Sequence, residues 1–197
     1  LKYEVKNMNI IPAVTLQNFD GSKSYDLFSL LLKERIIMLT GEINDDLASI
    51  VISEILYLNA SSPNEKITIY INSPGGSVSS GLAIYDVMKN ITSPIETIGM
   101  GLCASMGAFL LSSGSKGYRK AFQNCEIMIH QPLGGSNGQV SDLEIMTNRF
   151  IYLKKKLNKI LAENTSQPLE KINKDTDRNY FMSSEEALKY HLIDEIK

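Results

Sequence analysis

A strand-like run passes directly into a helix-forming run at Gly101-Leu102-Cys103-Ala104-Ser105-Met106-Gly107. A largely apolar, strand-like run at 95–100 precedes this stretch, and helix-forming residues 107–111 follow it. Ser105 therefore lies at a helix N-terminus, among small neighbours that leave its hydroxyl accessible. Backbone N–H groups at such a terminus lack partners in the helix and favour a developing negative charge. This suits a nucleophilic serine beside an oxyanion hole, although a serine that only caps the helix fits the same residues.

Outward from Ser105, strand patterns alternate with helix patterns. We expect strands at 35–39, 67–71, 95–100 and 126–130, and helices at 25–33, 78–88, 106–112, 141–164 and from 45 onward. Ser183 or Ser184 can cap a further short helix near the C-terminus. Alternating strands and helices predict βαβ units with right-handed crossovers, so the predicted fold class is α/β. The helix at 141–164 carries more apolar residues than a helix in water tolerates, which predicts self-association or burial against the chain.

The composition excludes several classes of function. A net charge of -2 and a pI near 5.8 argue against a nucleic-acid-binding surface. Lysines 154–156 form a basic run within a helical pattern, and we interpret them as a solvated face. No apolar stretch reaches the roughly 18 residues that a membrane span needs. We expect a single domain over residues 8–197, preceded by residues 1–7 as an extension or an upstream leader.

The cysteines and histidines predict neither a metal nor a cofactor. Cys103 and Cys125 form no C-x-x-C pair and have no metal-ligand spacing, so we expect two buried thiols in a cytoplasmic protein. With two histidines in the chain, a multi-histidine metal centre is not expected. His191 follows a tyrosine near a predicted helix end, where we interpret it as a helix-terminus residue.

His130 and the glycine-rich turn near Gly76 are the further candidates for a site. His130 ends a predicted strand, and sites form at the carboxyl ends of strands in open α/β sheets. It is therefore the candidate base for Ser105, although a strand-ending histidine can also be inert. Residues 72–77 (Asn-Ser-Pro-Gly-Gly-Ser) end a strand and open a helix, and glycine lets the backbone approach a ligand closely. A phosphate cradle is the rival interpretation, but G-x-G-x-x-G and G-K-[ST] are both missing.

Four ordered motifs resemble the ClpP family, the proteolytic subunit of the Clp protease. They are Tyr70-Ile71-Asn72-Ser73-Pro74-Gly75-Gly76-Ser77, the stretch 101–107, Met128-Ile129-His130-Gln131-Pro132-Leu133-Gly134-Gly135, and Asp175-Thr176-Asp177-Arg178. The resemblance extends from about Ile11 to Ile196. It implies a crotonase-like fold of stacked βαβ units with a protruding handle helix, the handle region covering about 131–165. It also implies two stacked heptameric rings that enclose a chamber.

The same resemblance implies roles for individual residues. Ser105 corresponds to the nucleophile and His130 to the base. The backbone N–H groups of Gly76 and Met106 correspond to the oxyanion hole. Residues 134–135 correspond to the start of the strand that pairs with extended polypeptide substrate. No cofactor is implied, and the ATP-driven partner is a Clp-family ATPase that feeds unfolded polypeptides.

The chain departs from the family at the third triad position. The family has an aspartate where this sequence has Asn179. An amide retains an acceptor oxygen but loses the charge that stabilises the imidazolium, so we expect reduced intrinsic activity. Asp177 lies two residues away and could substitute, but in a β-like segment residues i and i+2 lie well apart.

A second departure concerns the ATPase pocket on the outer ring face. Two aromatic positions of that pocket correspond to Thr68 and Asn90, whereas Tyr70, Ile98 and Met100 remain apolar. We therefore expect weak ATPase docking on a ring made only of this chain, and hypothesise a mixed assembly with a ClpP paralogue. Two alternatives stay open: a mainly structural subunit with little catalysis of its own, and a crotonase-fold activity on acyl-thioesters.

Overall fold

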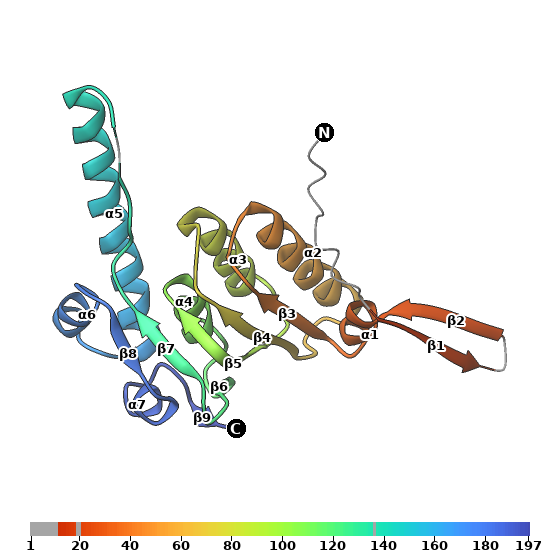
Figure 1. Cartoon of the computed structure of the whole chain (residues 1–197). Helices are drawn as coiled ribbons and strands as arrows, with labels where there is room; N and C mark the ends of the chain where they lie inside the picture. The colour runs from red at the N-terminus through yellow and green to blue at the C-terminus, as the bar shows by residue number, and fades with distance from the viewer. Residues whose placement is uncertain (1–11, 19–20, 136) are drawn as a thin grey trace, which may run out of the picture.

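A long helix and a two-stranded hairpin project from opposite sides of an α/β body (Figure 1). The computed structural model of the chain describes residues 12–18, 21–135 and 137–197. The hairpin pairs β1 (Ala13–Asn18) with β2 (Gly21–Asp26) in antiparallel register. The predicted extension at residues 1–7 lies outside the described part of the chain.

One mixed sheet forms the centre of the body. Its strands are β3 (Ile36–Thr40), β4 (Ile67–Ser73), β5 (Ile95–Ala104), β6 (Arg119–Ala121), β7 (Glu126–Ile129), β8 (Tyr180–Met182) and β9 (Glu195–Ile196). The path β3-β4-β5-β6-β9 is parallel at every step. Parallel neighbours need crossover connections, which the helices between these strands supply.

The sheet forks along β5, and the fork determines where the site forms. The first part of β5 pairs with β6 through Thr97–Gly99, and the last part pairs with β7 through Leu102–Ala104. Gly101 lies between the two parts with a φ of 61°, a backbone conformation that glycine adopts without steric cost. β7 therefore ends beside the end of β5, and β8 runs antiparallel along β7.

The helices are α1 (Leu27–Lys33), α2 (Asp45–Ser61), α3 (Val78–Asn90), α4 (Met106–Ser112), α5 (Val140–Thr165), α6 (Leu169–Asp175) and α7 (Ser184–Lys189). Side-chain caps fix several of their starts. Asn44 caps α2, Ser77 caps α3, and Ser183 forms a capping box with Glu186 at α7. α4 contacts β4, β5, β7, α3 and α5, and all its residues are buried. The helix that follows Ser105 is therefore held in the core from every side.

The expected α/β architecture with a projecting long helix is confirmed, and the deviations are local. The helix predicted from Tyr25 begins later, because Tyr25 and Asp26 pair with β1 and Asp26 then caps α1. The sequence did not predict the hairpin, α6, or the short strands β6, β8 and β9. Strands of two or three residues show no alternation to recognise, and β2 of the hairpin is largely polar.

The apolar residues of α5 fall into a buried group and an exposed group. Leu161 is buried against the body, and Leu157 packs beside it. Near the start of the helix, Val140 and Ile145 are 81% and 64% exposed. The handle region predicted at 131–165 therefore has an embedded base and an exposed apolar tip, and its helix begins at Val140.

Candidate active site

Ser105 occupies the junction between β5 and α4, as the sequence predicts. Its φ of 54° and ψ of -119° place a non-glycine residue in a sparsely populated conformation, which costs about 1–3 kcal/mol. Its N–H donates to Met128 O at 2.8 Å, which fixes the turn against β7. Its side chain makes no capping hydrogen bond to α4. The interpretation of Ser105 as a simple helix cap is therefore wrong.

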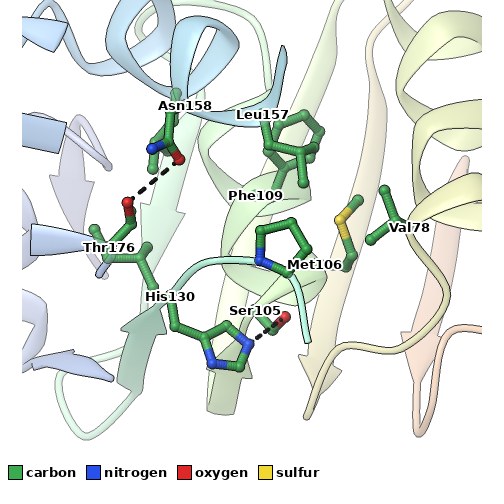
Figure 2. Close-up of a pocket in the computed structure, with 11 residues that line it drawn as sticks. Val78, Ser105, Met106, Phe109, His130, Leu157, Asn158 and Thr176 are labelled. Carbon is green, nitrogen blue, oxygen red and sulfur yellow. Dashed lines mark hydrogen bonds between the residues drawn. The ribbon is translucent and has the colours of Figure 1, made fainter. Parts of the chain in front are cut away.

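His130 presents its ring to the Ser105 hydroxyl (Figure 2). The distance from His130 Nε2 to Ser105 Oγ is 2.8 Å. The sheet register explains this contact, because Ala104 pairs with Met128 on parallel strands. The residues just beyond the two strand ends must then lie side by side. His130 is partly exposed, so a substrate can reach it.

Asn179 completes a line of three side chains. Its Oδ1 lies 3.0 Å from His130 Nδ1. Ile129 pairs with Tyr180 on antiparallel strands, so the residues just outside this pair, His130 and Asn179, face one another. With Nδ1 donating to Oδ1, Nε2 carries the lone pair that can accept the Ser105 proton. Within the described residues the Asn179 amide nitrogen makes no hydrogen bond to protein, so nothing there fixes the amide in this orientation.

The turn at Gly75 and Gly76 approaches Ser105 closely. A Cβ on Gly75 would lie 2.7 Å from the Ser105 Cβ, and a Cβ on Gly76 would lie 2.2 Å from Ile43 O. Ile43 holds the turn through hydrogen bonds to Gly75 O and from the Ser77 N–H. Only glycine fits both positions, where φ is 98° and 148°. The predicted oxyanion donors therefore come from two rigid backbones: this turn and the start of α4 at Met106.

An apolar pocket opens beside the serine (Figure 2). It encloses about 410 Å³ of empty space, including its open mouth. Its lining residues are Val78, Ser105, Met106, Phe109, Ile129, His130, Pro132, Leu157, Asn158, Leu161 and Thr176. The far wall comes from α5, where Asn158 is polar, and Asn158 accepts a hydrogen bond at 3.3 Å from Thr176, the residue that follows α6. No sequence pattern predicted this pocket, because its walls are mostly ordinary apolar residues from separate elements.

Asp177 does not take the place of the missing carboxylate. It lies in the turn after α6, not in the β-like segment that we expected, and its carboxylate binds Lys154 Nζ at 3.2 Å. The Nδ1 partner of His130 is Asn179. Lys154 also donates to Gln131 Oε1 at 2.8 Å, so the interpretation of the whole basic run as a solvated face is wrong for this lysine.

The two cysteines and His191 lie in the environments that the sequence predicts for their side chains. Cys103 and Cys125 are free and buried, with their sulfur atoms 3.9 Å apart. His191 follows α7 with a φ of 61°, a helix-terminus position far from Ser105 in the chain. The described residues contain no group of three or more side chains suited to a metal ion. Nor does any helix among them combine the length and hydropathy needed to cross a membrane.

A comparison with known protein families matches residues 19–197 to the Clp protease family. The matched residues include the strands of the central sheet and every helix from α1 to α7. They also include Ser105, His130 and Asn179. The chain belongs to the Clp protease family. Membership of this family indicates that the protein belongs to the general class of proteases, which hydrolyse peptide bonds. It agrees with the resemblance of the four sequence motifs to the ClpP family. It also agrees with the observed α/β architecture and its long projecting helix.

Proposed function

We propose that this Clp protease chain is a serine endopeptidase subunit with Ser105 as its nucleophile. One observation carries the proposal: Ser105 Oγ, the His130 ring and Asn179 Oδ1 form a continuous hydrogen-bonded line. A nucleophile activated by a base, which is itself oriented by a third group, is the arrangement that acyl transfer requires. The rival acyl-thioester activity has no comparable observation in its favour.

The steps follow from these positions. Ser105 Oγ bonds to the peptide carbonyl carbon as its proton passes to His130 Nε2. The resulting oxyanion is stabilised by the N–H groups of Gly76 and Met106, the donors that the family resemblance implies. His130 then gives the proton to the leaving nitrogen, the C–N bond breaks, and an acyl-enzyme remains. Water reverses the sequence with His130 as base and frees Ser105.

The pocket beside Ser105 supports a preference for apolar side chains before the scissile bond. Its walls at Met106, Phe109 and Leu157 offer no charge to pair with an acidic or basic side chain. Burying a charged group there without a partner costs several kcal/mol. Fluorogenic peptides with Leu or Met at that position should be cleaved faster than peptides with Asp, and equal rates would contradict this preference.

We expect the intrinsic rate to be low because Asn179 carries no charge. In serine proteases, replacing the triad aspartate by asparagine lowers kcat by about 10⁴. Part of that loss is electrostatic, and part comes from the wrong histidine tautomer, which a turned amide favours. The unbonded Asn179 amide nitrogen supports this second contribution.

The proposed working form is a barrel of two stacked heptameric rings that degrades polypeptides fed by a Clp-family ATPase. The exposed apolar tip of α5 supports ring–ring contact, because a helix face of that kind is unstable in water. A mixed assembly with a ClpP paralogue fits a chain with a weak triad. The second candidate function is a mainly structural subunit of such an assembly, and Asn179 is the observation that favours it.

Active-site labelling separates the two candidates. A fluorophosphonate probe should form a covalent adduct that peptide mapping places on Ser105, and Ser105→Ala should abolish it. His130→Ala should slow it by several orders of magnitude at unchanged assembly mass. If the native chain remains unlabelled both alone and mixed with a competent paralogue, the structural role is correct and the peptidase proposal is wrong.

A further inference from the structure

Two short segments carry His130 and Asn179 into the site, and they are tied together just behind these residues. The Gln131 N–H donates to Thr176 O at 2.6 Å, and Gln131 Nε2 donates to Asp177 O at 2.7 Å. Gln131 directly follows His130, and Asp177 lies two residues before Asn179. The separation between the His130 ring and the Asn179 amide therefore depends on this pair of hydrogen bonds.

Lys154, on helix α5, bonds to both of the segments that Gln131 connects. Its Nζ donates to Gln131 Oε1 at 2.8 Å and to Asp177 Oδ1 at 3.2 Å. The lysine side chain is 33% exposed, so its charge is partly withdrawn from water. An ammonium group has three donors and can satisfy both acceptors at once. Lys154 thus joins α5 to the segments on either side of the imidazole.

The same helix lines the pocket one turn further along. Leu157 and Asn158 lie three and four residues after Lys154 on α5, and both line the pocket beside Ser105. Asn158 in turn accepts a hydrogen bond from Thr176, in the segment that leads to Asn179. A displacement of α5 would therefore move the pocket wall and the orienting residue together.

We propose that Lys154 is a positioning residue for acylation, which keeps the Asn179 oxygen on His130 Nδ1 by fixing Gln131 and Asp177. The inference rests on the proposed function and deepens it. Asn179 provides a hydrogen-bond acceptor for the imidazole but no charge to attract it. Its effect on His130 therefore depends on the amide being held in place. Misplacement of a catalytic group by about 1 Å can cost 10²-fold in rate.

A plain surface ion pair is the competing explanation. Pairs of that kind contribute about 0–1 kcal/mol to stability and have no effect on chemistry. The chain offers a matched control, because Lys155 is the next residue on α5, is exposed, and makes no hydrogen bond or ion pair to the described residues. Lys154→Met and Lys155→Met thus differ mainly in the contacts to Gln131 and Asp177.

The test measures acylation of Ser105 by a fluorophosphonate, peptide kcat and KM, and amide hydrogen exchange on full-length protein of verified assembly mass. Lys154→Met should slow acylation and lower kcat about 10- to 100-fold while KM changes little. Exchange at the Gln131 amide should rise. Lys154→Arg should restore the rate, and Lys155→Met should behave as wild type.

The inference would be overturned by wild-type acylation in Lys154→Met, or by unchanged exchange at the Gln131 amide in that variant. A fall in rate shared equally by Lys155→Met would also overturn it. If the unaltered chain and Asn179→Asp both fail to acylate, the proposed function is wrong and the catalytic part of this inference falls with it. The exchange measurement would then still decide whether Lys154 holds the two segments.

Discussion

At the scale of single residues, the proposed site combines a candidate nucleophile, Ser105, with a candidate orienter, Asn179, that lacks charge. Ser105 and His130 are within hydrogen-bonding distance, and the strained backbone at Ser105 is fixed by its N–H bond to Met128. Asn179 contributes one oxygen at 3.0 Å. A carboxylate there would have no unproductive orientation, whereas an amide turned by 180° presents a donor to His130 Nδ1. The three side chains therefore have the geometry that the proposed peptidase requires, but the side chain at position 179 has no negative charge to stabilise an imidazolium.

The two cysteines give a prediction that is independent of catalysis. Contact with the Cys125 thiol and burial both raise the pKa of the Cys103 thiol, so its nucleophilic thiolate is scarce, and burial shields both sulfur atoms from a reagent. Native protein at pH 8 should react with a thiol reagent far more slowly than protein in denaturant, where both cysteines should titrate. Absorbance after addition of an aromatic disulfide reagent measures this. Rapid modification of the native protein would show that the thiols are reachable.

Residue types predicted Ser105 and His130, and the family resemblance supplied Asn179. Neither predicted Lys154, because a lysine within a basic run on a helix has the same pattern whether its ammonium faces water or a carboxylate. Asp177 was expected in an extended segment, but the end of α6 turns the chain there. Long-range contacts of this kind depend on how α5, α6 and β7 meet, which a local pattern does not encode.

At the scale of elements, the register of the β-strands brings the residues of the proposed site together. The forked strand β5 brings β7 alongside its last residues, and the antiparallel β8 then brings Asn179 opposite His130. The sequence predicted the strands that lead into Ser105 and His130, because these runs are rich in apolar residues and are bounded by turn residues. It did not predict β8, whose three residues are too few to show alternation.

A buried ion pair links three further elements. Arg119 on β6 donates from Nε to Asp194 Oδ2 at 2.9 Å and from Nη1 to Asn164 O at 2.6 Å. Burial alone would raise the pKa of Asp194, but hydrogen bonds from Arg119 and Gly117 outweigh it and hold that pKa below its ordinary value. The pair therefore ties β6 to the end of α5 and to the segment before β9.

Asp194→Asn should lower the free energy of unfolding at pH 7 by about 3 kcal/mol, since it leaves a buried guanidinium without its charge partner. Because the folded-state pKa is depressed, the stabilisation is present above the ordinary carboxyl pKa of about 3.9 and is lost as the pH falls through the folded value. Denaturant unfolding between pH 7 and pH 3 measures both effects.

Glu195→Gln is the matched control for this prediction. Its carboxylate pairs with Lys120 at 2.7 Å but is 53% exposed. Loss of an exposed pair should cost less than about 1 kcal/mol. Equal destabilisation by the two substitutions would show that the buried pair has no special role.

At the scale of the whole molecule, two surfaces determine how the chain would assemble. The tip of α5 exposes apolar side chains far from the body, which one subunit alone cannot cover (Figure 1). On the body, Thr68 donates to Glu96 at 2.9 Å, and Lys66 pairs with the same carboxylate at 3.0 Å. The place expected to carry aromatic contacts for an ATPase is thus charged, and Ile98 is fully buried, so it offers no exposed surface.

The α5 tip gives a prediction about assembly. Ile145→Glu should convert stacked rings to smaller species, because a buried isoleucine contributes about 2–3 kcal/mol and this change also buries a charge. Lys155→Glu introduces the same side chain at an exposed position nearer the body and should leave the mass unchanged. Sedimentation velocity provides the measurement. An unchanged mass for Ile145→Glu would place the contact elsewhere.

ATPase docking is predicted to be weak on a ring made only of this chain. Restoring the two aromatic positions with Thr68→Tyr and Asn90→Phe should tighten binding at least tenfold, about 1.4 kcal/mol. Calorimetric titration of a Clp-family ATPase onto the assembled chain measures this. Weak binding is expected because the Asn90 side chain donates a hydrogen bond to Asp86 O and adds no apolar contact. Tight binding by the unaltered ring would refute the prediction.

The central claim is that Ser105 is a competent nucleophile limited by the uncharged side chain at position 179. The most direct measurement is the rate of Ser105 acylation by a fluorophosphonate in the unaltered chain and in Asn179→Asp, compared at equal assembly mass. The substitution should raise the rate by at least about tenfold and at most about 10⁴, the full cost of the amide in serine proteases. Equal acylation rates in the two proteins would contradict the account.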